Sequence, residues 1–207
     1  LNPNPETSEV TDLVLEPKGS ENISFETFGV DGTNRAQIEF SSLPHIDFNA
    51  RLNYLIQYPH GCVEQTTSSV FPQLFMNAIF DLSADKKQRI QDHIKIGIDK
   101  LAHFQTPSGG FSYWRGGNTA NDWSSSYAGH FLIEAEKQGF VLPIDFKSKW
   151  IQYQKQAAKN WRYNQNNGYR NGLAQAYRLY TLALAGSADL SSMNRLRETK
   201  GIGEEAK

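Results

Sequence analysis

The chain has 207 residues, enough for one ordinary domain with part of a second, and its 39% hydrophobic content allows a real core. The formal net charge is −1, and Lys and Arg are scattered along the chain. The sequence therefore lacks the cluster of basic residues that is typical of proteins that bind nucleic acids or anionic membranes. No apolar run approaches the ~20 residues that a membrane helix needs, and one cysteine excludes an intrachain disulfide.

Residues 1–45 differ from the rest of the chain in the pattern of their apolar residues. Short apolar or alternating stretches at 10–15, 23–28 and 36–40 favour β-strands. Gly19, Gly29 and the pair Asp31-Gly32 supply turns between them, and Asp-Gly is a good hairpin signal. Three short strands predict a β layer that is incomplete by itself.

From about residue 46 the apolar residues follow a helical period. The clearest helix is expected over 86–104, where one face carries apolar side chains at i, i+4, i+8 and i+11. Further helices are expected at 49–57, 62–70, 72–79, 123–137, 146–161 and 173–184, with another that starts near 190. Pro59 ends the first of these, and Pro72 begins a helix at its tolerated first-turn position. The chain is therefore predicted to be mainly α.

A weak internal sequence repeat suggests how these helices are arranged. The loop at 105–114 leads into a helix that carries Tyr127, and the loop at 166–169 leads into one that carries Tyr177. The offset of about fifty residues is in the range of helical-hairpin repeats. The Gly-Gly-Phe-Ser-Tyr-Trp loop is similar to loops of α/α toroids, in which helical hairpins form a ring. We therefore expect a partial α/α toroid.

The single cysteine lies three positions before a glutamine, in the stretch Tyr58-Pro59-His60-Gly61-Cys62-Val63-Glu64-Gln65. Residues i and i+3 lie on one side of a helical turn, with Cβ atoms about 5–6 Å apart. From there the sulfur can attack the side-chain carbonyl and expel ammonia. The product is an internal thioester, an acyl group already activated for transfer.

This stretch resembles the thioester signature of the alpha-2-macroglobulin and complement family, whose usual form is Gly-Cys-Gly-Glu-Gln. Val63 replaces the middle glycine, which resembles the bacterial branch. The likeness extends over about 43–80, through Arg51-Leu52, Tyr54-Leu55-Ile56 and Phe71-Pro72. It implies that residues 46–207 are a thioester-bearing α/α toroid, shortened at its C-terminal end. Residues 1–45 would then be strands of an adjacent CUB-like or macroglobulin-like domain.

The resemblance also implies a function. Cys62 would be the thiol and leaving group, and Gln65 would supply the acyl carbon. The parent would be a periplasmic or cell-envelope inhibitor that traps proteases through their lysine amines, without a cofactor and without turnover. Its partners would be target proteases and the other domains of the parent chain, with no nucleic acid and no membrane span in this segment.

Other residues near the motif have supporting roles in this hypothesis. Pro59 and Gly61 are expected to form the bend that presents Cys62 at a helix start, where the thiol pKa is lowered. Glu64 belongs to the motif without an assigned role. A thioester survives only where water is excluded, and aromatic side chains that could provide cover are Tyr54, Tyr58, Phe71, Phe75 and Trp114.

The histidines bear on which acceptor is preferred. Some family members direct the acyl group to hydroxyls with a downstream histidine, and no histidine here lies in a segment that resembles that loop. We expect His93 and His103 at the surface or a boundary, and His130 in the core. The resemblance then suggests direct aminolysis.

Two alternatives remain open from the residues alone. In the first, Cys62 is an inert thiol in a non-reactive α/α-toroid interaction module. In the second, the fold carries a cyclase-like or prenyltransferase-like enzyme, which needs an Asp-rich motif or zinc ligands. Neither feature is visible, since no His or Cys pair has ligand spacing.

Overall fold

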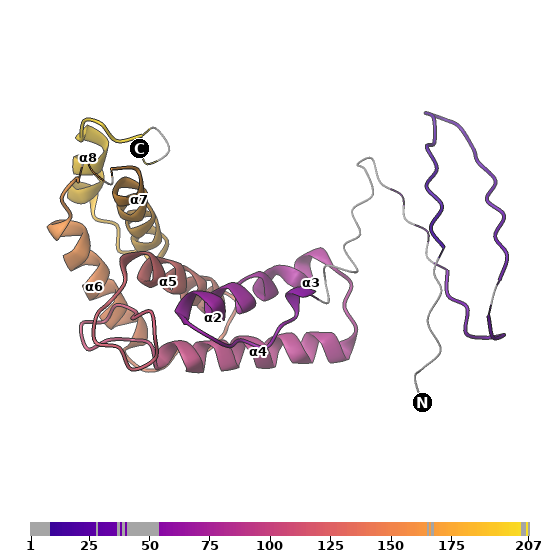
Figure 1. Cartoon of the computed structure of the whole chain (residues 1–207), viewed down its shortest axis with the longest axis horizontal. Helices are drawn as coiled ribbons and strands as arrows, with labels where there is room; N and C mark the ends of the chain where they lie inside the picture. The colour runs from indigo at the N-terminus through magenta and orange to yellow at the C-terminus, as the bar shows by residue number, and fades with distance from the viewer. Residues whose placement is uncertain are drawn as a thin grey trace. The chain divides into compact units, whose positions relative to one another are not determined.

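The computed structural model describes residues 9–27, 29–36, 38, 40, 54–164, 166, 168–203 and 206. The chain divides into two compact units, Leu1–Ile46 and Asp47–Lys207. Helices occur in the second unit (Figure 1).

The described residues of the first unit form turns and irregular chain, so the strands expected at 10–15, 23–28 and 36–40 are absent there; residues 28, 37 and 39 lie outside the description. A strand needs a partner for its backbone and cover for its apolar face. In the described part of this unit the cover is missing, because apolar side chains of these stretches are exposed: Val10 by 71%, Phe25 by 69% and Phe40 by 80%.

The second unit is mainly helical, as the apolar period predicts. Its described elements are α2 (Val63–Val70), the 3₁₀ helix η1 (Pro72–Phe75), α3 (Met76–Ile79), α4 (Ala84–Ala102), α5 (Asp122–Lys137), α6 (Phe146–Asn160), α7 (Gly168–Leu184) and α8 (Leu190–Glu198). Of the helix expected at 49–57, Tyr54 and Leu55 are helical, and residues 49–53 lie outside the description. No described helix has the length and apolar character to cross a membrane.

The helices are arranged in two layers. α5 packs against α2 on one side and α7 on the other, so these three helices form one layer. α4 packs against α2, α6 against α5 and α7, and α8 against α7, which places them in the other layer (Figure 1). This alternation is that of a partial α/α toroid.

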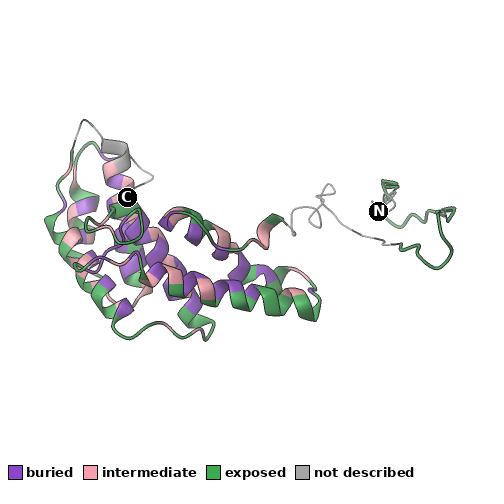
Figure 2. Ribbon diagram, turned by 60° about the horizontal axis from the view of Figure 1, so that its bottom comes forward, coloured by how far each residue is buried: buried purple, intermediate pink, exposed green. Residues whose placement is uncertain are grey.

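The apolar faces of the helices form the core between the layers (Figure 2). The face expected on the 86–104 helix is buried throughout: Ile90, Ile94, Ile98, Leu101 and Phe104 are each 5% exposed or less. Full burial of one such side chain contributes about 1.5–3 kcal/mol. A second apolar cluster joins α6, α7 and α8 around Trp161 and Leu182. Because its apolar face is fully buried, α4 provides a firm support for α2, which packs on it.

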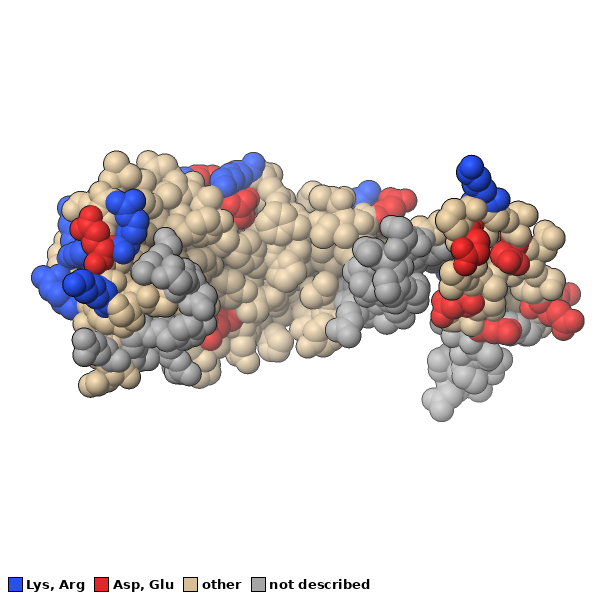
Figure 3. Space-filling model, turned by 90° about the horizontal axis from the view of Figure 1, so that it is seen from above, with Lys and Arg blue, Asp and Glu red and all other residues tan. Residues whose placement is uncertain are grey.

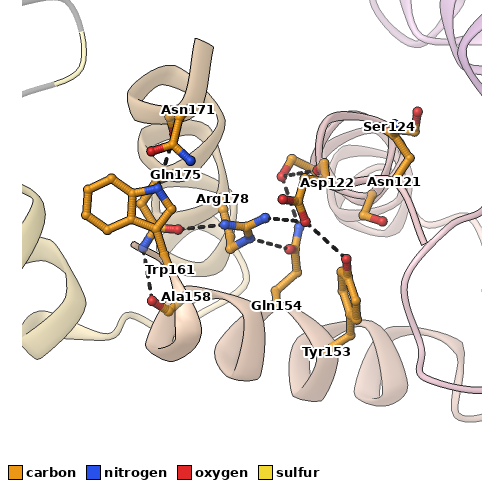
Figure 4. A network of polar contacts seen from close by, with 12 residues as sticks. Asn121, Asp122, Ser124, Tyr153, Gln154, Ala158, Trp161, Asn171, Gln175 and Arg178 are labelled. Carbon is orange, nitrogen blue, oxygen red and sulfur yellow. Dashed lines mark hydrogen bonds and ion pairs between the residues drawn. The ribbon is translucent and has the colours of Figure 1, made fainter. Parts of the chain in front are cut away.

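A buried polar network fixes the beginning of α5 (Figure 4). The guanidinium of Arg178 on α7, which is 2% exposed, donates to Gln154 Oε1 at 3.1 Å and Gln175 Oε1 at 2.6 Å, and forms an ion pair with Asp122 at 2.6 Å. Gln154 in turn donates to Ser126. A buried guanidinium is stable only when its charge and its N–H donors are paired. Because the partners of Arg178 come from α5, α6 and α7, these contacts hold the three helices together.

Charged side chains of both signs are spread over this unit. On the face shown in Figure 3, uncharged residues cover its middle, and Lys and Arg side chains gather at the end formed by α6–α8. α8 carries Arg195 and Arg197 in its last turn, where the helix dipole stabilises positive charge.

Candidate functional site at the start of α2

The chain enters α2 through a bend that α4 supports. Gly61 has a φ of +87°, and Cys62 is the extended N-cap residue of α2. The Lys100 amine of α4 donates to the Pro59 carbonyl at 2.7 Å and lies 4.5 Å from the centre of the Tyr58 ring. The Tyr58 and His93 rings also pack perpendicular to each other, with their centroids 5.9 Å apart. Residues 58 and 59, which lead into the motif, are therefore held by α4 through the Pro59 carbonyl and through the Tyr58 ring.

Cys62 and Gln65 bind each other across the first turn of α2. The Cys62 backbone N–H donates to Gln65 Oε1 at 3.0 Å, and the Cys62 side chain accepts from the Gln65 backbone N–H in a reciprocal capping box. The sulfur and the carboxamide therefore lie at the same end of the helix. Cys62 is 3% exposed, whereas Gln65 is exposed to solvent.

This geometry suits attack on the carboxamide. Oε1 is the atom that gains negative charge when a nucleophile adds to the Gln65 side-chain carbon. A backbone N–H already aimed at that oxygen stabilises the charge as an oxyanion-hole donor does. The helix N-terminus adds a positive potential on the side where this negative charge develops.

Tyr113 is a site residue that the sequence analysis missed. Its backbone carbonyl accepts from the Val63 N–H at 3.2 Å. Hydrogen bonding with the Cys62 side chain, together with the charge of Glu64, raises the pKa of the Tyr113 phenol. The Gly-Gly-Phe-Ser-Tyr-Trp loop was the available signal, but it pointed to Trp114, which is 63% exposed and packs on Tyr113.

In the structure, Glu64 connects α2 to α5, a role that the sequence did not indicate. Glu64 Oε1 accepts from the Ser124 hydroxyl at 3.3 Å. Ser124 is buried in the first turn of α5, and its backbone N–H donates to the Asn121 side chain that caps this helix (Figure 4). Glu64 therefore joins the motif helix to the helix whose beginning the Arg178 network fixes.

The aromatic candidates for a water shield lie in different places. Tyr54, Tyr58 and Trp114 are exposed by 73%, 52% and 63%. Phe71 is half-buried and packs against His130, Phe131 and Phe75. Tyr54 and Gln65 share a cleft of about 400 Å³, whose other lining residues are Leu55, Gln57, His60, Ser68 and Ser69.

The histidines differ partly from expectation. His93 was expected at the surface or a boundary but is 9% exposed, with Nδ1 3.2 Å from Gln73 Oε1. Burial is the main cause of its lowered pKa. His130 is half-buried, with Nδ1 3.0 Å from the Tyr177 hydroxyl. Among the described residues, no group of three His, Cys, Asp or Glu could hold a metal ion.

Gly61→Ala tests whether the carboxamide must lie where it does. A Cβ at residue 61 would stand 2.0 Å from Gln65 Oε1, and the positive φ would add about 1–2 kcal/mol of strain. We expect the carboxamide to be displaced and any chemistry between Cys62 and Gln65 to fall at least tenfold. The measurement is the yield of methylamine adduct at Gln65.

Gly186→Ala is the matched control, because Gly186 also has a positive φ but nothing lies within 4 Å of an added Cβ. It should carry the strain and leave the chemistry unchanged. Equal losses in both variants would contradict the steric explanation.

A helical toroid with a cysteine and a glutamine paired across the first turn of a helix is of the thioester-domain class. The sequence profile of the A-macroglobulin TED domain matches residues 41–175. The chain belongs to this family and is a thioester domain of the alpha-2-macroglobulin type.

Individual relatives agree with this assignment. Alpha-2-macroglobulin of Escherichia coli K12 is 32% identical over 117 residues, which are 55% of this chain and 7% of that protein. Salmonella alpha-2-macroglobulin reacted with methylamine superposes with a TM-score of 0.65 at 28% identity, over 75% of this chain and 11% of that one. The native E. coli protein from domain MG7 to its C-terminus gives 0.63 at 25% identity, over 75% and 26%. The chain thus spans less than a tenth of the curated relatives it matches.

Proposed function

We propose that Cys62 and Gln65 form an internal thioester, and that this domain is the acylating part of a protease-trapping inhibitor. The observation that carries the proposal is the reciprocal hydrogen bonding between the two residues across the first turn of α2. The Tyr113 carbonyl supports it, because it accepts from the Val63 N–H at 3.2 Å and so holds the residue after the cysteine at the start of α2.

Thioester formation follows from that arrangement. The Cys62 thiolate adds to the Gln65 side-chain carbon, and the charge on Oε1 is stabilised by the Cys62 N–H. The C–N bond breaks, and ammonia leaves with the proton of the thiol. The acyl group of Gln65 is then bonded to sulfur and stored in the protein.

In the parent protein, a protease would release this stored group and be captured by it. A lysine amine of the protease would attack the acyl carbon, form an amide bond and expel the Cys62 thiol. Because each thioester reacts once, the domain is an inhibitor component and not a turnover enzyme. The methylamine-reacted Salmonella protein supports an amine acceptor for this chain. The bacterial relatives support a cell-envelope or periplasmic location.

Intact mass of freshly purified protein tests the proposal. Thioester formation removes ammonia, so the mass should be about 17 Da below the encoded value, with no titratable thiol. Methylamine should then raise the mass to about 14 Da above the encoded value, place the adduct on Gln65 and free one thiol. Methylamine should also react in preference to glycerol.

The full encoded mass, a free thiol and no adduct at any methylamine concentration would support the inert-module alternative instead. A preference for glycerol would contradict direct aminolysis while leaving the thioester in place.

A further inference from the structure

The cleft beside Gln65 is a candidate approach route for the acceptor. It has a volume of about 400 Å³ and is lined by Gln65 and by residues that precede and follow the motif. Cys62, in contrast, is buried and is not among the residues that line the cleft. A nucleophile can therefore reach the exposed Gln65 side chain through this cleft.

His60 is the side chain of that cleft with the chemistry of a base. Its Nδ1 lies 3.0 Å from the Tyr58 carbonyl oxygen. A carbonyl only accepts, so this contact assigns the proton of the neutral imidazole to Nδ1. Nε2 then carries a lone pair, as in catalytic histidines whose other nitrogen is held by a hydrogen bond.

The other lining groups are less suited to this task. The hydroxyl of Ser69 donates to the Thr66 carbonyl, and that of Ser68 pairs with the Tyr127 hydroxyl. Tyr54 presents a phenol, whose oxygen lacks the basic lone pair that an imidazole nitrogen offers. The charged groups nearby are engaged elsewhere: Lys100 at the Pro59 carbonyl, and Glu64 at Ser124.

We propose that the cleft is the acceptor site of the thioester, and that His60 Nε2 takes the proton of the attacking primary amine. This inference rests on the proposed function. It assigns to the site a catalytic residue that lies two positions before the cysteine, within the motif itself.

The step balances with the groups present. The amine nitrogen bonds to the Gln65 acyl carbon, and the resulting oxyanion is stabilised by the Cys62 N–H. Nε2 takes one proton from the nitrogen. The C–S bond breaks, and the Cys62 thiolate takes that proton from the imidazolium through solvent. The products are an amide on Gln65, a free thiol and a neutral His60.

His60→Gln is the central test, because glutamine can still donate to the Tyr58 carbonyl but cannot act as a base. The experiment measures the rate of methylamine transfer to Gln65 by intact mass, starting from protein with the 17 Da deficit. General-base catalysis contributes about 10²–10⁴-fold, so we expect a loss of at least tenfold. Spontaneous hydrolysis of the thioester should slow as well.

A purely structural role makes the opposite prediction for hydrolysis. If His60 only shields or positions the thioester, its replacement admits water, and the 17 Da deficit disappears faster. Free imidazole gives a second readout: it should restore transfer in His60→Ala, where space is open, and leave the wild type unchanged. His103→Gln, at the exposed C-terminal end of α4, is the matched control and should react as the wild type does.

The outcomes separate this inference from the function on which it rests. Slow transfer with imidazole rescue supports it. Unchanged transfer in His60→Gln, faster hydrolysis, or failure to form the thioester overturns it while the wild-type adduct still stands. A wild-type protein without mass deficit or adduct overturns both.

Discussion

Gln65→Glu should abolish both the loss of 17 Da and all incorporation of methylamine. A carboxylate oxygen can replace Oε1 as acceptor of the Cys62 N–H, so the capping box and the fold should persist. A carboxylate is not an electrophile, however, and has no ammonia to lose. The expected result is the full encoded mass and one titratable thiol, a complete loss of acyl transfer.

The matched control is Gln91→Glu, which places the same charge on an exposed position of α4. It should leave the mass deficit and the adduct as in the wild type. Cys62→Ala should match Gln65→Glu in adduct formation, although it also removes the thiol that Tyr113 contacts. Methylamine incorporation at another glutamine in any of these variants would contradict the assignment of the acyl group to Gln65.

Gly129→Ala should clearly destabilise the helical unit. A Cβ there would lie 2.1 Å from Trp150 Cε2 and 2.3 Å from its Nε1. The indole is 1% exposed and donates to the Ser125 carbonyl at 2.7 Å, so it cannot move without losing this hydrogen bond. Overpacking of this kind costs about 1–3 kcal/mol, more than the ~1 kcal/mol that alanine contributes to a helix over glycine.

The measurement is the midpoint of urea unfolding followed by far-UV circular dichroism. Gly172→Ala, in α7, is the matched control, because its added Cβ would meet Ala206 at 3.5 Å in ordinary contact. It should raise the midpoint through helix propensity alone. A rise in both variants would show that α5 and α6 are packed less tightly at Trp150 than the structure indicates.

The first turn of α5 connects the site with the rest of the fold. Asp122 forms the ion pair with the buried Arg178, and two residues later Ser124 donates to Glu64 of the motif. The position of α2 is therefore linked through α5 to α6 and α7. This explains why an acidic residue between Cys62 and Gln65 belongs to the motif although it does not contact the carboxamide through any hydrogen bond described.

The sequence by itself determined the helices and the proximity of Cys62 and Gln65, because both depend on short-range spacing. The i, i+4 repeat of α4 and the i, i+3 relation of Cys62 and Gln65 are fixed by the geometry of a helical turn. The described residues of the stretches 10–15, 23–28 and 36–40 form no strand for a related reason: a strand is completed by its neighbours, and a local pattern cannot supply them.

Only the tertiary structure decided which other residues serve the pair. Tyr113 and Ser124 lie about fifty or sixty positions after the motif, and contact across such a distance depends on how α2 packs against α5 and the loop before it. His60 is adjacent in sequence, yet its orientation is set by the Gly61 bend and the Tyr58 carbonyl. Spacing along a chain predicts neighbours within a helix, whereas packing chooses the neighbours between helices.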